Sequence, residues 1–364
     1  MTITIVRRIV AVMTLAVTAC VPGTAWAQAS RWQADHDAGW TAYKEGRFVE
    51  AEKLLSSAEK ESRAFGANDP RLATTLDHLA WVLCAEGKAP EAEPLAKEAL
   101  GLREKALGPK HPDVAKSLNT LACVYDIQGK FDEARPAYER CLTLSEMTNG
   151  PGHPSVAAVL DNLATVSHAQ GKNAEAEAFY KRAFAVRENA PGAKDTDLAP
   201  TLYNLGTLYL DQKKYVQAEP LYKHALAIQE KNLGSDHPEV ATTLEALGWL
   251  YAKQGKNAEA EPLLKHALTI FERTLGPDHP HVARCCAKMG KVCCDQGKHA
   301  EAESCCVKAV TILEKTKADP VALAKTLQDY ATVLRQTNRT AEAEKLDTRA
   351  KTILEKQGHT QESK

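Results

Sequence analysis

The chain has 364 residues, of which 26% are charged, and its formal net charge is −1 at pH 7. Lys and Arg do not cluster in one segment, so the composition excludes the basic surface that nucleic-acid-binding proteins need. A chain of this length predicts two or more globular domains, but an internal repeat with a period of 42 residues overrides that expectation.

The first 27 residues have the pattern of an export signal. Two arginines precede an apolar run from Ile9 to Ala19, and an Ala-Trp-Ala sequence ending at Ala27 provides a cleavage site. This pattern predicts a signal peptide over residues 1–27, and the run is too short to span a membrane. A Val-Thr-Ala-Cys sequence ending at Cys20 resembles a bacterial lipobox. We therefore expect an exported protein that is periplasmic or secreted, or alternatively an outer-membrane lipoprotein anchored through Cys20.

Residues 33–64 follow as a degenerate first unit, and the regular repeats begin after them. Six copies of the 42-residue unit fill residues 72–316 and begin at Leu72, Val114, Val156, Leu198, Val240 and Val282. In each copy, two stretches carry apolar residues at helical spacing, and a Gly-Lys turn separates them, with Lys213 in place of Gly in the fourth copy. A fixed period of this length indicates stacked helix-turn-helix units and no single closed core.

A last hairpin is expected over residues 321–356, and residues 357–364 form a polar tail. The fold class is therefore all-α, with about eight stacked hairpins in a solenoid that occupies residues 33–356.

Three recurring positions have a structural explanation. One slot in each copy holds only small residues, which let the two helices of a hairpin approach closely: Ala80, Ala122, Ala164, Gly206, Gly248 and Gly290. Histidines precede the proline that begins a first helix, and we expect them to cap that helix and not to bind metal: His111, His153, His237 and His279. Asn257, directly after a Gly-Lys turn, is expected to cap the second helix.

The residues of these units resemble a known family. Leu-x-x-Leu-Gly-x-x-Tyr in the first helix and Ala-x-x-x-Tyr-x-x-Ala in the second (Ala218, Tyr222, Ala225) resemble the tetratricopeptide repeat. The long unit, with its Leu-Gly-x-Asp-His-Pro step, resembles the kinesin-light-chain type of that repeat, without the coiled coil that binds the motor. The resemblance implies a right-handed superhelix whose concave groove is lined by the first helices. It also implies a non-catalytic scaffold that binds a protein or peptide partner.

Side chains that project away from the apolar seam of the first helices are the candidates for this groove. Asparagine both donates to and accepts from a peptide backbone, and tryptophan and tyrosine provide rigid contact area. The candidates are Asp77, His78, Trp81, Asn119, Asn162, Tyr203, Asn204, Glu245 and Trp249. The alternative is that they are merely exposed helix positions. Because the candidate groove is mixed to acidic, a basic or neutral segment is the expected ligand.

The sixth copy departs from the pattern, because it holds six of the ten cysteines of the chain. Four of them replace the Leu or Tyr of other copies: Cys286, Cys293, Cys305 and Cys306. They are interpreted as reduced core residues, as a disulfide from Cys306 to Cys286 or Cys293, or as thiolate ligands of a soft metal. The last interpretation uses all four and makes a thiol-based metal-binding or redox-responsive protein the alternative function.

Motifs of enzymes are missing from the sequence. It contains no glycine-rich nucleotide loop, no His-Glu-x-x-His and no Gly-x-Ser-x-Gly. We therefore expect no catalytic residues, no cofactor and no enzymatic activity, and the identity of the partner does not follow from these residues.

Overall fold

The structure is a computed structural model that describes residues 22–66, 69–190, 192, 194–316 and 320–362. Most of the predicted signal peptide, including Cys20, lies outside the described residues. The backbone of residues 22–27 belongs to the first helix, so the predicted cleavage site after Ala27 lies within that helix.

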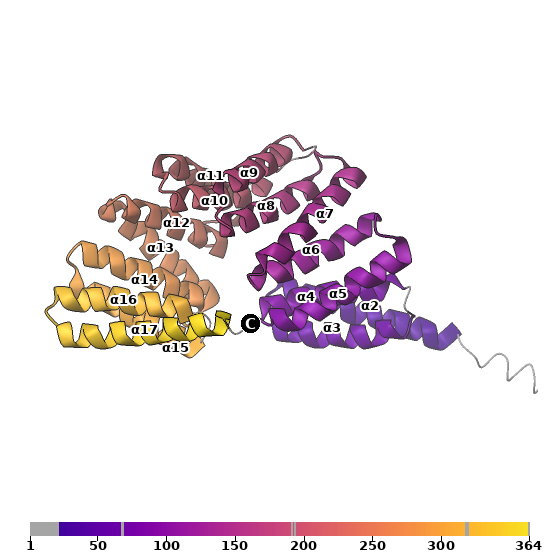
Figure 1. Cartoon of the computed structure of the whole chain (residues 1–364), viewed down its shortest axis with the longest axis horizontal. Helices are drawn as coiled ribbons and strands as arrows, with labels where there is room; N and C mark the ends of the chain where they lie inside the picture. Colours follow the sequence, from indigo (N-terminus) through magenta and orange to yellow (C-terminus); the bar gives the residue numbers. More distant parts are fainter. Residues whose placement is uncertain (1–21, 67–68, 191, 193, 317–319, 363–364) are drawn as a thin grey trace, which may run out of the picture. The chain divides into compact units, whose positions relative to one another are not determined.

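The described chain consists of helices in consecutive pairs (Figure 1). They are α2 (Pro22–Lys44) with α3 (Phe48–Arg63), α4 (Pro70–Ala85) with α5 (Ala89–Leu107), α6 (Pro112–Ile127) with α7 (Phe131–Asn149), α8 (Pro154–Ala169) with α9 (Asn173–Glu188), α10 (Asp195–Asp211) with α11 (Tyr215–Leu233), α12 (Pro238–Lys253) with α13 (Asn257–Leu275), α14 (Pro280–Asp295) with α15 (His299–Thr316), and α16 (Pro320–Gln336) with α17 (Thr340–Glu362). The predicted all-α fold of stacked hairpins is confirmed. The last helix continues through residues 357–362, which were expected to form a polar tail.

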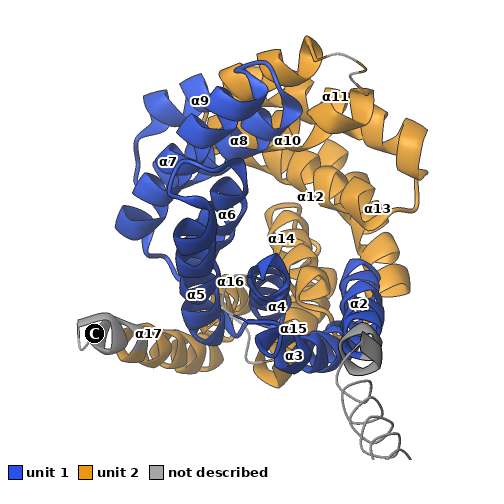
Figure 2. Ribbon diagram, turned by 90° about the vertical axis from the view of Figure 1, so that its right-hand side faces the viewer, with its two compact units in different colours: residues 1–179 blue, residues 180–364 orange. Residues whose placement is uncertain are grey.

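The chain divides into two compact units, residues 1–179 and residues 180–364, and the division falls within α9 (Figure 2). In the first unit α4 contacts α2 and α6, and α6 contacts α8; in the second unit α12 contacts α10 and α14, and α14 contacts α16. Second helices make no such contacts with one another in the part of the chain that the structure describes. In each unit the first helices therefore lie next to one another, and we call the surface they form the first-helix face.

The starts of the first helices are fixed by proline and histidine. His111, His153, His237 and His279 each accept, through Nδ1, the backbone N–H of the residue two positions later at 3.1–3.2 Å. The residue after each histidine is a proline at the first helical position, where its missing N–H is not needed. The capping role predicted for these histidines is confirmed.

The prediction that Asn257 caps α13 was wrong. The cap residue is Lys256, whose side chain makes no capping hydrogen bond, and Asn257 is the first residue of the helix. The turn uses Gly255 in a left-handed conformation (φ 77°) to end α12, so one residue fewer than expected is left before α13 begins.

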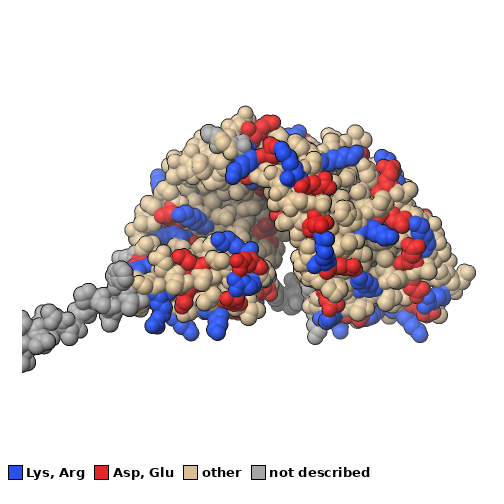
Figure 3. Space-filling view, turned by 180° about the vertical axis from the view of Figure 1, so that it is seen from behind, with Lys and Arg blue, Asp and Glu red and all other residues tan. Residues whose placement is uncertain are grey.

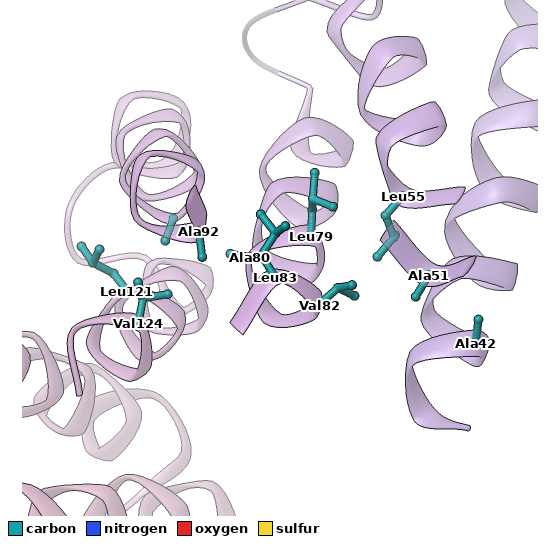
Figure 4. Close-up of a cluster of buried hydrophobic side chains, with 11 residues drawn as sticks. Ala42, Ala51, Leu55, Leu79, Ala80, Val82, Leu83, Ala92, Leu121 and Val124 are labelled. Atoms are coloured by element: carbon teal, nitrogen blue, oxygen red, sulfur yellow. The ribbon is translucent and has the colours of Figure 1, made fainter. Parts of the chain in front are cut away.

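Small residues bring the two helices of a hairpin together, as predicted. A Cβ atom on Gly248 would lie 2.9 Å from Cγ of Leu264 and 3.2 Å from the carbonyl oxygen of Ala260, both on α13. Ala80 holds the equivalent slot in the first full repeat, where it is buried in a cluster with Leu79, Leu83 and Ala92 that joins α2 to α6 (Figure 4). None of the described helices is long and apolar enough to cross a membrane.

Candidate functional site

Two acidic candidates of the predicted groove lie inside the repeat stack. Asp77 on α4 is 4% exposed and pairs with Nη1 of Arg103 on α5, while Ser117 Oγ on α6 donates to it at 2.9 Å. Burial raises the pKa of Asp77, and Arg103 and Ser117 oppose that effect. This carboxylate therefore joins three helices and is covered by them.

Glu245 on α12 has the same position in its repeat and is 1% exposed. Arg284 on α14 donates to it from Nε at 2.9 Å and from Nη2 at 2.7 Å, and Lys288 Nζ lies 2.9 Å away. Burial acts to raise the pKa of Glu245, but these two cations outweigh it and hold the pKa below its usual value. We assign Asp77 and Glu245 to the interior of the stack and not to a surface that contacts a ligand.

His78 is part of an aromatic stack on α2 and α4. Its ring centroid lies 3.9 Å from that of Trp40 and 4.9 Å from that of His36, and His36 stacks in turn on Trp32 at 5.0 Å. Burial lowers the pKa of His78 to about 4, so the ring is neutral at physiological pH. Trp81, one turn further along α4, is half-buried.

The polar candidates of the middle repeats are half-buried. Asn162 Nδ2 on α8 donates to Asn119 Oδ1 on α6 at 3.2 Å, so these amides link adjacent first helices. Asn119 also lines a cavity of about 480 Å³ between α6, α7 and α8. Tyr203 tilts against Tyr222 with ring centroids 5.7 Å apart, and Asn204 beside it is half-buried.

Trp249 lines a pocket of about 380 Å³ between α12, α14, α15 and α16, which we call the α12–α16 pocket. Its apolar walls include Leu313 and Ala322. Its charged lining residues are Arg284, Lys288, Lys325 and Asp329. Two ammonium groups lie over the ring of Trp249, with Lys253 Nζ 4.5 Å and Lys288 Nζ 5.8 Å from its centroid.

Sequence reasoning selected Trp249 for this site but missed Arg284, Lys325 and Asp329. Lys325 and Asp329 lie in the last hairpin, which is out of the 42-residue frame, so alignment of repeats gave no position for them. On the face drawn in Figure 3, basic and acidic side chains are interspersed. The lining of this pocket holds three cations and one carboxylate, and two of the cations also pair with the buried Glu245.

The cysteines of the sixth repeat lie on α14 and α15, where five of the six are buried and Cys305 is half-buried. Cys285 and Cys294 are thus core residues as well, although only Cys286, Cys293, Cys305 and Cys306 were predicted to be. All six are free thiols in the structure. The disulfide from Cys306 to Cys286 or Cys293 stays a prediction.

Burial raises the pKa of Cys286 and of Cys306 to about 12, so these thiols are protonated at neutral pH. Within the described residues, no three His, Cys, Asp or Glu side chains are arranged to hold a metal ion. That result covers the four-cysteine set considered from the sequence.

Two solved structures with TM-scores above 0.5 show the fold, and a third is similar over a shorter part of the chain. BtubC (BKLC) from P. vanneervenii is 21% identical, with a TM-score of 0.54 over 64% of this chain and 92% of that chain. The apo form of RapI is 14% identical, with a TM-score of 0.61 over 78% of this chain and 99% of that chain. A putative kinesin light chain with TPR-like repeats from Podosopora anserina is 25% identical, with a TM-score of 0.48 over 57% of this chain and 98% of that chain.

No protein with a curated description matches the chain in sequence. The tetratricopeptide repeat family, in contrast, matches residues 34–105, 82–147, 127–189, 197–273 and 285–356, which together make up most of the chain. This match agrees with the structure, in which helices pair as hairpins and small residues lie where the two helices cross. The chain belongs to the tetratricopeptide repeat family.

Proposed function

We propose that this chain is a non-catalytic scaffold that binds a segment of a partner protein on its first-helix face. Tetratricopeptide repeat proteins generally mediate protein–protein interactions, which supports a protein partner. The observation that carries the proposal is the α12–α16 pocket, where an aromatic ring and three cations line one opening on the first-helix face. We propose this pocket as the main anchor for the bound segment.

The lining of the pocket indicates which segment it takes. Trp249, Leu313 and Ala322 offer apolar surface to one bulky side chain. Arg284 and Lys288 share the charge of Glu245, and Lys325 makes no ion pair at bonding distance among the described residues but acts electrostatically on Asp329. Three cations thus stand against the two carboxylates of Glu245 and Asp329. Positive charge therefore exceeds negative charge at the opening, and the ligand is an acidic segment with an apolar anchor residue. The basic or neutral segment expected from the sequence is less suited, because the acids Asp77 and Glu245 are covered.

Binding of labelled peptides tests this proposal. Fluorescence anisotropy is measured with two eight-residue peptides that share a central leucine, one flanked by glutamates and the other by lysines. We expect the acidic peptide to bind and the basic one not to. Trp249→Ala and Lys325→Glu should each weaken binding about tenfold, since both remove contacts at the centre of the site.

Lys60→Glu on α3 is the matched control, because Lys60 is an exposed lysine on a second helix and should not affect binding. The melting temperatures of all variants are compared with that of the unaltered chain. Equal binding of both peptides, or equal effects of Lys325→Glu and Lys60→Glu, would remove the pocket from the proposal. A photo-crosslinking residue at position 325, compared with one at position 60, extends the test to the natural partner in intact cells.

We also propose that the protein works in the cell envelope or outside the cell. The arginines, apolar run and cleavage site of the first 27 residues support this location. Amino-terminal sequencing of the protein from a periplasmic fraction should begin at Gln28. A start at Cys20 with a bound fatty acid would indicate the lipoprotein alternative, and an intact Met1 would contradict export.

A further inference from the structure

The cysteine-rich hairpin of α14 and α15 is not explained by partner binding on the first-helix face. One side of this hairpin, against α13, opens as a cavity of about 400 Å³. Three sulfur-bearing side chains line it: Met289 and Cys293 from α14 and Cys305 from α15. The charged side chains of its lining are Glu261 and Lys265 from α13 and Glu301 from α15.

Helix geometry explains why these three side chains line the same cavity. Met289 and Cys293 are four residues apart on α14, so their side chains are neighbours on one surface of the helix. Gly290 lies between them at the crossing with α15, where a Cβ atom would lie 2.9 Å from Sγ of Cys306 and 3.3 Å from the carbonyl oxygen of Ala302. The missing side chain at Gly290 therefore lets α15 approach α14 closely, and Cys305, next to Cys306, lines the same cavity as Met289 and Cys293.

We propose that Met289, Cys293 and Cys305 form a binding site for one Cu(I) ion. Thiolate and thioether sulfurs are the soft ligands that select Cu(I), and a monovalent ion of this kind needs only two or three of them. Zn(II) is less suited, because structural zinc sites use four ligands and no group of three His, Cys, Asp or Glu ligands exists among the described residues. Of the charged side chains beside the opening, Glu261 is paired with Lys298 at 2.6 Å, while Glu301 and Lys265 carry opposite charges. The sulfur ligands therefore carry the proposal, and the surrounding charge does not.

The other four cysteines of the hairpin are assigned to packing. Cys285 donates to the carbonyl oxygen of Leu264 at 3.3 Å, and Cys294 donates to Oε1 of Gln336 at 3.0 Å. Cys286 and Cys306 are buried in the core. The proposed site thus keeps Cys293 and Cys305 from the set considered from the sequence and replaces the other two thiols by the thioether of Met289.

Binding of Cu(I) at this site releases two protons. Burial raises the pKa of Cys293 to about 11 and also raises that of Cys305, so both are thiols at neutral pH. Formation of two Cu–S bonds breaks two S–H bonds, and two protons leave to solvent without any change in oxidation state. Apparent affinity should therefore increase with pH, by up to about tenfold per pH unit for each proton released.

The test is titration of the reduced full chain with Cu(I) under anaerobic conditions, in competition with a bathocuproine chelator. We expect one Cu(I) per chain and an X-ray absorption spectrum with a sulfur-only first shell. The double variant Cys293→Ser with Cys305→Ser should lose at least about tenfold in affinity, and Met289→Leu should lose less, because the two thiolates remain.

Two control variants separate this site from general thiol binding. Cys84→Ser with Cys123→Ser removes two half-buried thiols of the first unit, and Cys286→Ala with Cys306→Ala removes the neighbouring core thiols. Both should keep the affinity of the unaltered chain. A chain that retains no Cu(I), a tighter hold on Zn(II) than on Cu(I), or a loss of affinity in a control but not in the Cys293/Cys305 variant would overturn the proposal. Melting temperatures of the metal-free variants show whether each one is folded.

Discussion

Glu245 is a carboxylate at a position of the first helix that faces the interior of the stack. Burial of a single charge costs several kcal/mol unless partners compensate, and here Arg284 and Lys288 on the next first helix do so. Both cations are partly exposed, at 47% and 23% of their side chains, so they are hydrated in part while they pair. The ion pairs thus fasten α12 to α14 and hold Arg284 and Lys288 in place at the edge of the α12–α16 pocket.

Glu245→Gln should lower the free energy of unfolding by about 1–3 kcal/mol at pH 7, because charge-assisted hydrogen bonds are lost. The cations hold the pKa of folded Glu245 below its unfolded value, so its contribution is fully present above that unfolded value, about 4.3. It is lost as the pH falls through the folded pKa. The difference between variant and unaltered chain in urea unfolding should therefore shrink below about pH 4.

Glu259→Gln, at an exposed position of α13, is the control and should change little at any pH. A difference that stays constant from pH 7 to pH 3 would show that the charge of Glu245 does not matter for stability.

The sequence predicted where these carboxylates lie along the helices but not that they are buried. Their partners come from other helices, since Arg103 follows Asp77 by 26 residues and Arg284 follows Glu245 by 39 residues. A helical projection of one segment shows which way a side chain points, whereas its burial depends on what the next helix places opposite. The histidine caps were predictable, because both partners of that hydrogen bond lie within two residues.

At the scale of the helix pair, the small-residue position of the first helix sets how closely the two helices of a hairpin approach. Contacts between successive repeats then hold each hairpin on the preceding one. The turn lysines contact the preceding second helix, with Lys88 paired to Glu52 at 2.8 Å, Lys130 to Glu93 at 2.7 Å and Lys298 to Glu261 at 2.6 Å. These pairs are partly exposed and contribute little each, but they recur with the partners 36 or 37 residues apart. The small slot has a larger effect, because it sets the crossing distance of the helices.

Gly248→Ala should destabilise the chain by about 1–3 kcal/mol through overpacking against Leu264, although alanine favours a helix over glycine by about 1 kcal/mol. Gly101→Ala on α5 is the matched control, because a Cβ atom there meets nothing within 4 Å. That control should stabilise by about 0.5–1 kcal/mol through helix propensity alone. Opposite changes in the melting temperatures of the two variants would support the close crossing at Gly248, and stabilisation by both variants would contradict it.

At the scale of the whole chain, the repeat made the fold predictable and left the ligand unpredictable. Every copy specifies its own two helices and one turn. Because the same local pattern recurs in each copy, the helices and turns of one copy support the prediction for the others. The α12–α16 pocket depends instead on what distinguishes the copies, such as Trp249 in the fifth and Lys325 in the last hairpin. The sulfur-lined cavity likewise arises from residues that only the sixth repeat has.

Deletions test whether the chain is a stack of interchangeable units. Removal of Val240 to His281 takes out one period and should leave a shorter, cooperatively folded protein, because contacts are local in such stacks. Lys298 then faces Glu219, which holds the position of its present partner Glu261, and Arg284 loses Glu245 but stays partly hydrated. We expect the ellipticity per residue to be retained in circular dichroism.

Removal of residues 257–277 is the matched comparison, since it deletes α13 and half a period. The buried residues Leu244, Leu247 and Leu250 on α12 then lose the packing of α13 on that helix. Helix α14, which packs on α13 in the unaltered chain, must pack on α12 instead. This variant should melt over a broader range and at a lower temperature than the one that lacks a full period. Equal and equally cooperative melting of the two deletions would mean that the hairpin is not the unit of this fold.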